Sequence, residues 1–262
     1  MCLIAVAWNC HPRYRLALIA NRDEAHDRAA VPAGVDPDDP TLYGGRDLRA
    51  GGGWLMASRH GRLAAVTNVR AGLAEGTMPR SRGALVRDFA AGSMAADAFV
   101  ATLAPVAPQY GRFNLLAWDG AGLEFASNHP GFQRHPVAPG LHAMSNGAFD
   151  ARWPKSGHAV RALESWLAGD DVRQGGDDDH ALAPLFDALA DTTPAPDDAL
   201  PDTGVGLELE RRLSPPFVLG PHYGTRCSTV VLVDDRAITF VEQSYGPEGV
   251  RLGRTRGRFA IG

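Results

Sequence analysis

The stretch Cys2-Leu3-Ile4-Ala5-Val6-Ala7-Trp8 decides the fold, because every residue in it is apolar. Turn residues at Asn9-Cys10-His11-Pro12 lead into a second, largely apolar run at residues 15–20. Short apolar runs bounded by turn residues are typical of strands that are buried on both faces. The sequence therefore predicts a buried antiparallel hairpin whose second strand ends on the polar residues Asn21-Arg22-Asp23-Glu24.

The rest of the chain alternates between groups of strands and groups of helices. Hairpins are predicted at residues 54–58 with 62–68, 113–118 with 123–127, and 229–233 with 238–243, with a short strand at 141–145. Apolar residues recur every three or four positions at 81–90, 94–103, 156–167 and 180–190, which predicts helices. This order predicts an α+β fold with two stacked antiparallel sheets and helices on the outside.

Two segments read as irregular connections within one domain spanning residues 1–262. Glycines in Gly44-Gly45-Arg46-Asp47 and Gly51-Gly52-Gly53 indicate a mobile connection that can bring backbone close to a ligand. Residues 169–205 are rich in Asp, Gly and Pro, which indicates a solvated, variable insertion around one short helix.

Composition excludes several classes of partner. A net charge of −4 gives no general attraction for nucleic acid or for anionic membranes. No run approaches the roughly 18 apolar residues of a membrane span, so we expect no such span and a cytoplasmic location. Three cysteines are too few for a disulfide framework, and nine histidines lack ligand spacing, so no metal site is expected.

Cys2 is the strongest candidate for chemistry. Removal of Met1 would give Cys2 a free α-amine, whose pKa of about 7.7–8.0 suits it to take the thiol proton. On its position alone, Cys2 is better interpreted as a small apolar member of a buried strand. The choice between these interpretations depends on the residues that surround it.

Polar residues at the strand ends supply the other parts of a nucleophilic site. Arg22 could lower the pKa of the thiol, and Asp23 or Glu24 could orient the ammonium group. Asn21 and Glu24 could bind or orient the substrate. Asn68 and Asn146 could donate hydrogen bonds to an oxyanion. Arg226 could fix the charge of the site. Turn formation and structural ion pairing are the alternative roles of these residues.

Eight short motifs spread over nearly the whole chain resemble the NRDE family, also called the transport-and-Golgi-organisation family. They are Met1-Cys2-Leu3-Ile4, Asn21-Arg22-Asp23-Glu24, Gly45-Arg46-Asp47-Leu48, Gly52-Gly53-Trp54-Leu55, Thr67-Asn68-Val69-Arg70, Ser145-Asn146-Gly147, Trp153-Pro154-Lys155 and Tyr223-Gly224-Thr225-Arg226. Members of that family have been connected with Golgi organisation, lipid metabolism and cytoplasmic haem trafficking.

The order of these motifs is also distantly similar to N-terminal-nucleophile hydrolases of the penicillin V acylase and bile-salt hydrolase group. That resemblance implies a four-layer αββα fold with Cys2 as nucleophile. It implies an oxyanion or substrate-orienting role for Asn68 and Asn146. Arg226 matches an arginine that occurs late in the sequences of that group. The group has Arg-Asn-x-Asp at the end of its second strand. Arg22 and either Asp23 or Glu24 match its arginine and aspartate in residue type, but their spacing here is different.

Two functions follow as expectations. The first is an amidohydrolase that needs no cofactor and cleaves a linear amide of a small acyl compound. The alternative is a non-catalytic cytoplasmic carrier that binds haem or an acyl lipid in the same cleft. Haem would require an axial ligand, for which His129, His142 and Cys2 are the candidates.

Overall fold

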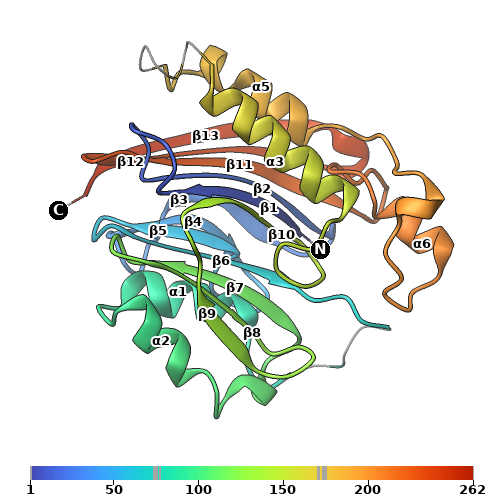
Figure 1. Ribbon diagram of the computed structural model, residues 1–262, viewed down its shortest axis with the longest axis horizontal. Coiled ribbons are helices and arrows are strands. Elements are labelled where there is room, and N and C mark those ends of the chain that lie inside the picture. The colour runs from blue at the N-terminus through green and yellow to red at the C-terminus, as the bar shows by residue number, and fades with distance from the viewer. Residues whose placement is uncertain (1, 73–75, 77, 170–171, 173–175, 262) are drawn as a thin grey trace.

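The computed structural model describes residues 2–72, 76, 78–169, 172 and 176–261, and of Cys2 it describes the backbone alone. Within these residues the chain forms four layers, in which two antiparallel sheets stack face to face and helices cover both outer faces (Figure 1). The predicted α+β class with a four-layer αββα arrangement is confirmed.

The first sheet contains the N-terminal hairpin. In spatial order, its described strands are β10 (Gly140–Met144), β1 (Cys2–Trp8), β2 (Leu16–Ala25), β11 (Tyr223–Val233), β12 (Ala237–Tyr245) and β13 (Arg251–Ala260). The second sheet runs β3 (Ala30–Val35), β4 (Leu42–Asp47), β5 (Leu55–Ser58), β6 (Arg62–Asn68), β7 (Phe113–Trp118), β8 (Leu123–Ser127) and β9 (Gln133–Pro136).

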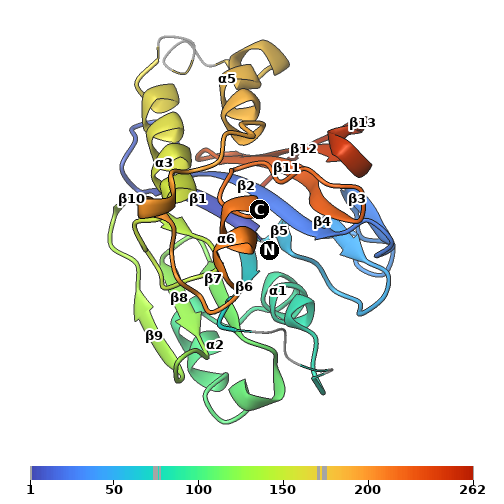
Figure 2. The same ribbon diagram turned by 90° about the vertical axis from the view of Figure 1, so that its right-hand side faces the viewer.

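Helices cover the outer faces as expected from the apolar periodicity. α3 (Pro154–Leu167) and α5 (Asp179–Leu189) lie on the first sheet, and α1 (Arg82–Ala91) and α2 (Ala96–Thr102) lie on the second. α6 (Leu207–Arg212) lies at the end of the molecule where β1 begins (Figure 2). Short 3-10 turns occupy Ala107–Gln109, Asp197–Ala199 and Pro247–Gly249.

Successive side chains of β1 point to opposite faces of the sheet, and both faces are buried, which explains why its residues are all apolar. Ile4 and Val6 contribute to the core between the two sheets, whereas Leu3 and Ala5 pack beneath α3 and α5. A strand that is buried on both faces has no position for a solvated side chain. The first hairpin is therefore a rigid platform for the residues at its end.

The structure differs from the sequence-based expectation at the glycine-rich connection. Residues 44–47 belong to β4, which pairs with β5 through Tyr43 and Ala57 and is not a mobile loop. A Cβ atom at Gly45 would lie 2.0 Å from Cζ2 of the Trp54 ring. Glycine therefore lets the indole lie against this strand, which is a tertiary requirement and not a sign of flexibility.

The segment at 169–205 contains more packed structure than a solvated insertion. The described part includes α5, at the position predicted for a helix, with Leu182, Leu185 and Leu189 fully buried against the first sheet and α3. Asp178 caps this helix by accepting a hydrogen bond from the backbone N–H of Ala181 at 2.9 Å. No helix in the described residues is both long and apolar enough to span a membrane.

Candidate active site

The start of β1 lies beside a large cavity. The backbone of Cys2 pairs with Arg22 in β2, as the predicted hairpin requires. Arg22, Asp23, Glu24 and Asn68 all line a cavity of about 960 Å³, which we call the cleft. The side chain of Cys2 and the whole of Met1 lie outside what the structure describes.

Arg22 is held by two groups from the β4–β5 region. Its guanidinium carbon lies 4.2 Å from the centroid of the Trp54 ring, and its Nη2 lies 3.5 Å from Oδ2 of Asp47. Arg28 donates from Nε to the same carboxylate oxygen at 2.5 Å. Burial alone would raise the pKa of Asp47, but Arg28 and the backbone N–H groups of residues 49 and 50 hold it below the ordinary value. Asp47 therefore stays ionised and fixes Arg22, whose side chain is almost completely buried.

Asp23 is the buried carboxylate of the site. It is 1% exposed, and its Oδ1 accepts a hydrogen bond from Oγ1 of Thr225 at 2.7 Å. Burial raises the pKa of Asp23, and the positive charges of Lys155 and Arg22 oppose that rise. Asp23 directly follows Arg22, the residue that pairs with Cys2, and is therefore one position nearer to that pair along β2 than Glu24.

Asn68 and Asn146 form one unit at the end of β6. Asn146 is fully buried, and its Nδ2 donates to the backbone oxygen of Asn68 at 2.7 Å and approaches Oδ1 of Asn68 at 3.3 Å. The amide hydrogens of Asn146 are therefore directed at Asn68, while Asn68 itself lines the cleft. Met144 pairs with Ile4, so the next two residues of the chain carry Asn146 to the level of Cys2.

Three of the predicted site residues make mainly structural contacts. Asn21 does not line the cleft, because its Nδ2 donates to the backbone oxygens of Leu189 and Pro216 beneath the helical layer. Arg226 occupies the bulge in β11 and donates to the backbone oxygens of Ala25 and Arg28. Glu24 lines the cleft, where its Oε1 accepts from the N–H of Ala25 and its Oε2 lies 3.7 Å from Arg28.

Sequence reasoning gave no role to several residues that build this site. Trp54 and Asp47 belong to the motifs Gly52-Gly53-Trp54-Leu55 and Gly45-Arg46-Asp47-Leu48, which carry the family resemblance but assign no role to either side chain. Lys155 is the only lysine in the chain, is 3% exposed and donates from Nζ to the backbone oxygen of Leu213 at 3.0 Å. A single lysine in an arginine-rich chain was the available signal for it.

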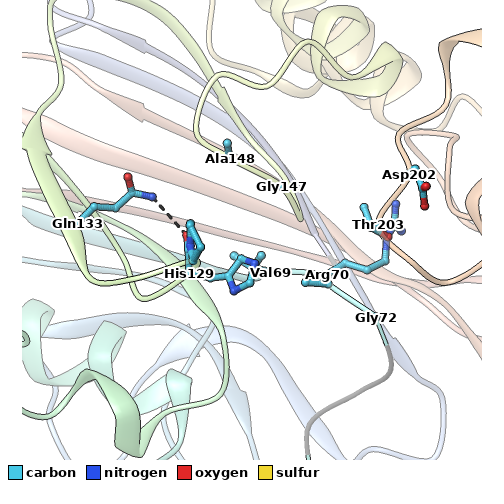
Figure 3. Close-up of a pocket in the computed structure, with 11 residues that line it drawn as sticks. Val69, Arg70, Gly72, His129, Gln133, Gly147, Ala148, Asp202 and Thr203 are labelled. Atoms are coloured by element: carbon cyan, nitrogen blue, oxygen red, sulfur yellow. Dashed lines mark hydrogen bonds between the residues drawn. The ribbon is translucent and has the colours of Figure 1, made fainter.

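A second cavity, of about 350 Å³ (Figure 3), shares residues 69–72 of its lining with the cleft. His129 lines it, and the backbone oxygen of His129 accepts a hydrogen bond from Nε2 of Gln133 at 3.3 Å. Arg70 lies between the two cavities and donates from Nε to Oγ1 of Thr203 at 2.7 Å. This contact fixes the wall that both cavities share.

The two histidines predicted as haem ligands do not line the cleft in the described part of the chain. Both ring nitrogens of His142 are engaged, Nδ1 with Oδ2 of Asp150 at 2.7 Å and Nε2 with the backbone oxygen of Ala138 at 2.8 Å. His129 faces the smaller cavity. The described residues of the cleft therefore do not provide a histidine ligand for haem iron.

Comparison with known proteins gives matches along almost the entire chain. A family model described as "Transport and Golgi organisation 2" matches residues 1–247. The "Transport and Golgi organization protein 2 homolog" of Bos taurus is 31% identical, over 100% of this chain and 99% of that protein. The Homo sapiens homolog is 30% identical, over 93% of both chains.

Among solved structures, a similar one is the "Caenorhabditis elegans N-acylethanolamine-hydrolyzing acid amidase (NAAA) ortholog". Its TM-score is 0.49 at 10% identity, with 88% of this chain and 92% of that chain covered. The family model and the two relatives agree with one another and with the resemblance carried by the sequence motifs. The chain belongs to the Transport and Golgi organisation 2 family.

Proposed function

We propose that this protein is an amidohydrolase that uses Cys2 as an N-terminal nucleophile to cleave a linear amide of a small acyl compound. The observation that carries the proposal is the meeting of Arg22, Asp23 and Asn68 in one cleft at the end of the strand pair that begins with Cys2. A cation, a carboxylate and an amide donor are the groups that such a nucleophile requires.

Activation of the thiol begins with removal of Met1. The α-amine of Cys2 then takes the thiol proton, and the guanidinium of Arg22 stabilises the thiolate. Asp23 is the better of the two carboxylates for holding the resulting ammonium group. It is fully buried beside the strand partner of Cys2, whereas Glu24 already accepts from Ala25 and lies near Arg28.

The thiolate attacks the carbonyl carbon of the amide, and the negative charge moves to the carbonyl oxygen. Asn68 donates from its Nδ2 to this oxyanion. Asn146 is a positioning residue, because it holds the Oδ1 side of Asn68 and so turns the Nδ2 side away from itself. A donor fixed in this way is worth roughly 2.7–4 kcal/mol in the transition state.

Collapse of the intermediate breaks the carbon–nitrogen bond and leaves an acyl thioester on Cys2. The ammonium group of Cys2 gives its proton to the departing nitrogen, which leaves as an amine. The regenerated α-amine then takes a proton from water, and the hydroxide attacks the thioester. The carbon–sulfur bond breaks, the carboxylic acid leaves, and the ammonium proton returns to the Cys2 thiolate. Asp23 stays ionised throughout.

The test compares wild type with Cys2→Ala and Cys2→Ser on a panel of N-acyl amides of increasing chain length. We expect turnover by wild type, no turnover by Cys2→Ala and at most weak turnover by Cys2→Ser, since a hydroxyl is a poorer nucleophile at neutral pH. Equal turnover by all three proteins would refute the proposal. Intact-mass measurement of each protein establishes whether Met1 has been removed.

A carrier function in the same cleft is the second candidate, and the acyl-lipid form of it is favoured by the apolar residues Val205, Leu209 and Leu213 in the cleft lining. The haem form lacks a histidine ligand among the described lining residues. For either function we propose a cytoplasmic location, since Cys10 and Cys227 are free thiols, as is usual in a reducing compartment. Saturable binding of an acyl compound without any cleavage would favour the carrier.

A further inference from the structure

The cleft has a charge opposite to that of the whole chain. The chain carries a formal net charge of −4. The described lining of the cleft nevertheless contains eight arginines against three carboxylates, those of Asp23, Glu24 and Asp47. A cavity with this excess of positive charge focuses a positive potential into its interior and attracts anions.

The inner arginines already have protein carboxylates as partners. Arg22 and Arg28 share Asp47, and Arg28 also lies 3.7 Å from Glu24. Arg70 pairs with the buried carboxylate of Glu210, which hydrogen bonds to Thr203 as well. These three arginines have structural partners, so they do not account for the positive excess.

The excess lies at the opening of the cleft. Arg49, Arg80 and Arg212 are exposed, and no carboxylate among the described residues lies within 4.0 Å of their guanidinium nitrogens. We call these three residues the rim arginines. They come from the β4–β5 turn, the approach to α1 and the end of α6, three segments far apart in sequence that line one cavity. Arg82 and Arg112 line the same cavity, where their guanidinium groups donate to the backbone oxygens of Arg112 and Ala71 respectively.

One part of the lining is apolar. Val205, Leu209, Leu213 and Val218 come from the region around α6, and Val66 lies on β6. An apolar wall next to a positively charged opening suits a molecule with an apolar part and an anionic part. A neutral amide would leave the rim arginines without a ligand partner.

We infer that the amide cleaved in this cleft carries an anionic group, a carboxylate or a phosphate, on the portion that leaves as the amine. The acyl part lies against the apolar wall, and the reacting carbonyl lies at the end of β2. The amine portion extends to the open rim, through which it departs. Guanidinium groups bind carboxylate and phosphate through the same paired N–H geometry, so both anions fit. That the ligand is an amide cleaved in this cleft rests on the proposed function; that it carries an anionic group rests on the rim arginines.

The experiment uses three decanoyl amides that differ only in the amine portion: N-decanoylglycine, N-decanoyl-O-phosphoethanolamine and the neutral N-decanoylethanolamine. Binding is measured calorimetrically with Cys2→Ala protein, and kcat/KM is measured with wild type. The test variant replaces Arg49, Arg80 and Arg212 by glutamine. Arg236→Gln is the matched control, because Arg236 is exposed in the β11–β12 turn and does not line the cleft.

We expect at least one anionic amide to bind Cys2→Ala protein roughly tenfold more tightly than the neutral amide, from a few exposed ion pairs each worth about 2–5-fold. The triple variant should lose that preference, 0.5 M salt should reduce it, and Arg236→Gln should retain it. The tighter of the two anions identifies the group that is bound.

Equal binding of all three amides would overturn the inference, as would loss of the preference in Arg236→Gln or its survival in the triple variant. Failure of the proposed function gives a different result. Wild type would then cleave none of the three amides, while the binding preference in Cys2→Ala protein would still be measured.

Discussion

The side-chain amide of Asn146 donates to the backbone oxygen of Asn68 at 2.7 Å, which connects the irregular segment after β10 to the end of β6. Because Asn146 is fully buried, this bond fixes the position of the residue that lines the cleft. The oxyanion role expected for both asparagines therefore divides into a donor, Asn68, and a residue that positions it, Asn146. This division can be tested by substitution.

Asn146→Ala should lower kcat with little change in KM, because Asn68 loses its fixed orientation. It should also lower the free energy of unfolding by about 1–3 kcal/mol, since a buried carbonyl group loses its donor. Steady-state kinetics and urea denaturation measure the two effects. Asn128→Ala also removes partly buried hydrogen bonds, to Phe113 and Ala107, but outside the cleft. It should reduce stability and leave kcat unchanged; a loss of kcat in both variants would contradict the assigned role.

Trp54→Leu should slow alkylation of Cys2 at pH 6 by about 2–5-fold. The indole face that holds the Arg22 guanidinium is lost, and the cation then stabilises the thiolate less well. Peptide mapping after treatment with iodoacetamide separates Cys2 from Cys10 and Cys227. Trp54→Phe retains an aromatic face and should restore most of the rate. Identical rates in Leu and Phe variants would show that ring stacking does not matter.

Asp23 predicts a specific dependence of stability on pH. Burial raises the pKa of this carboxyl group in the folded protein, so the folded state binds the proton more tightly than the unfolded chain. Raising the pH above the unfolded carboxyl pKa of about 3.9 therefore costs stability, until the folded pKa is passed. Asp23→Asn should remove this loss, and its stability relative to wild type should increase across that range. Denaturation at a series of pH values measures the free energy of unfolding of both proteins. If the two free energies changed with pH in parallel, the prediction would be contradicted.

The same carboxyl group should set the acid limb of activity. Asp23 must be ionised to hold the ammonium group, so kcat/KM should fall at acid pH with a midpoint above the ordinary aspartate value. Asp23→Asn should reduce activity and remove this limb. Glu24→Gln should keep the limb, and its loss in that variant would assign the orienting role to Glu24.

Arg70 and Glu210 should contribute strongly to stability. Both side chains are at least nine-tenths buried, and Glu210 also accepts from the hydroxyl of Thr203. Arg70→Met leaves a buried carboxylate without its cation, which should cost about 3–5 kcal/mol of unfolding free energy. The exposed pair of Arg211 with Asp197 is the matched control, and Arg211→Met should have little effect. Equal losses in the two variants would show that burial does not determine the contribution.

The fold could be predicted where the apolar pattern alone determines it. β1 and β2 pair as expected, and α1, α2, α3 and α5 lie within two residues of the predicted helices. β3, β4, β9 and β13 were not predicted, because glycine, proline and arginine in these segments give no strand pattern. β13, for example, exposes most of its residues and forms by pairing with β12. These strands depend on neighbours that are distant in sequence.

The candidate site shows the same division. The pairing of Cys2 with Arg22 follows from hairpin geometry, so it could be predicted from the sequence. The contact of Trp54 with Arg22 depends on how the two sheets stack, and the burial of Lys155 depends on where α3 meets residue 213. The sequence alone does not show which distant segments come into contact, so neither feature could be predicted from it. The roles of Cys2, Asp23 and Asn68 stay predictions that the following measurement addresses.

The most direct test of the account is the detection of an acyl group on Cys2 during turnover. Wild-type protein mixed with an N-acyl amide and quenched in acid should show, by intact mass, a chain without Met1 that carries one acyl group. Peptide mapping should place that group on Cys2. A chain that retains Met1 and still cleaves the amide, or an acyl group that persists in Cys2→Ala protein, would contradict the central claim.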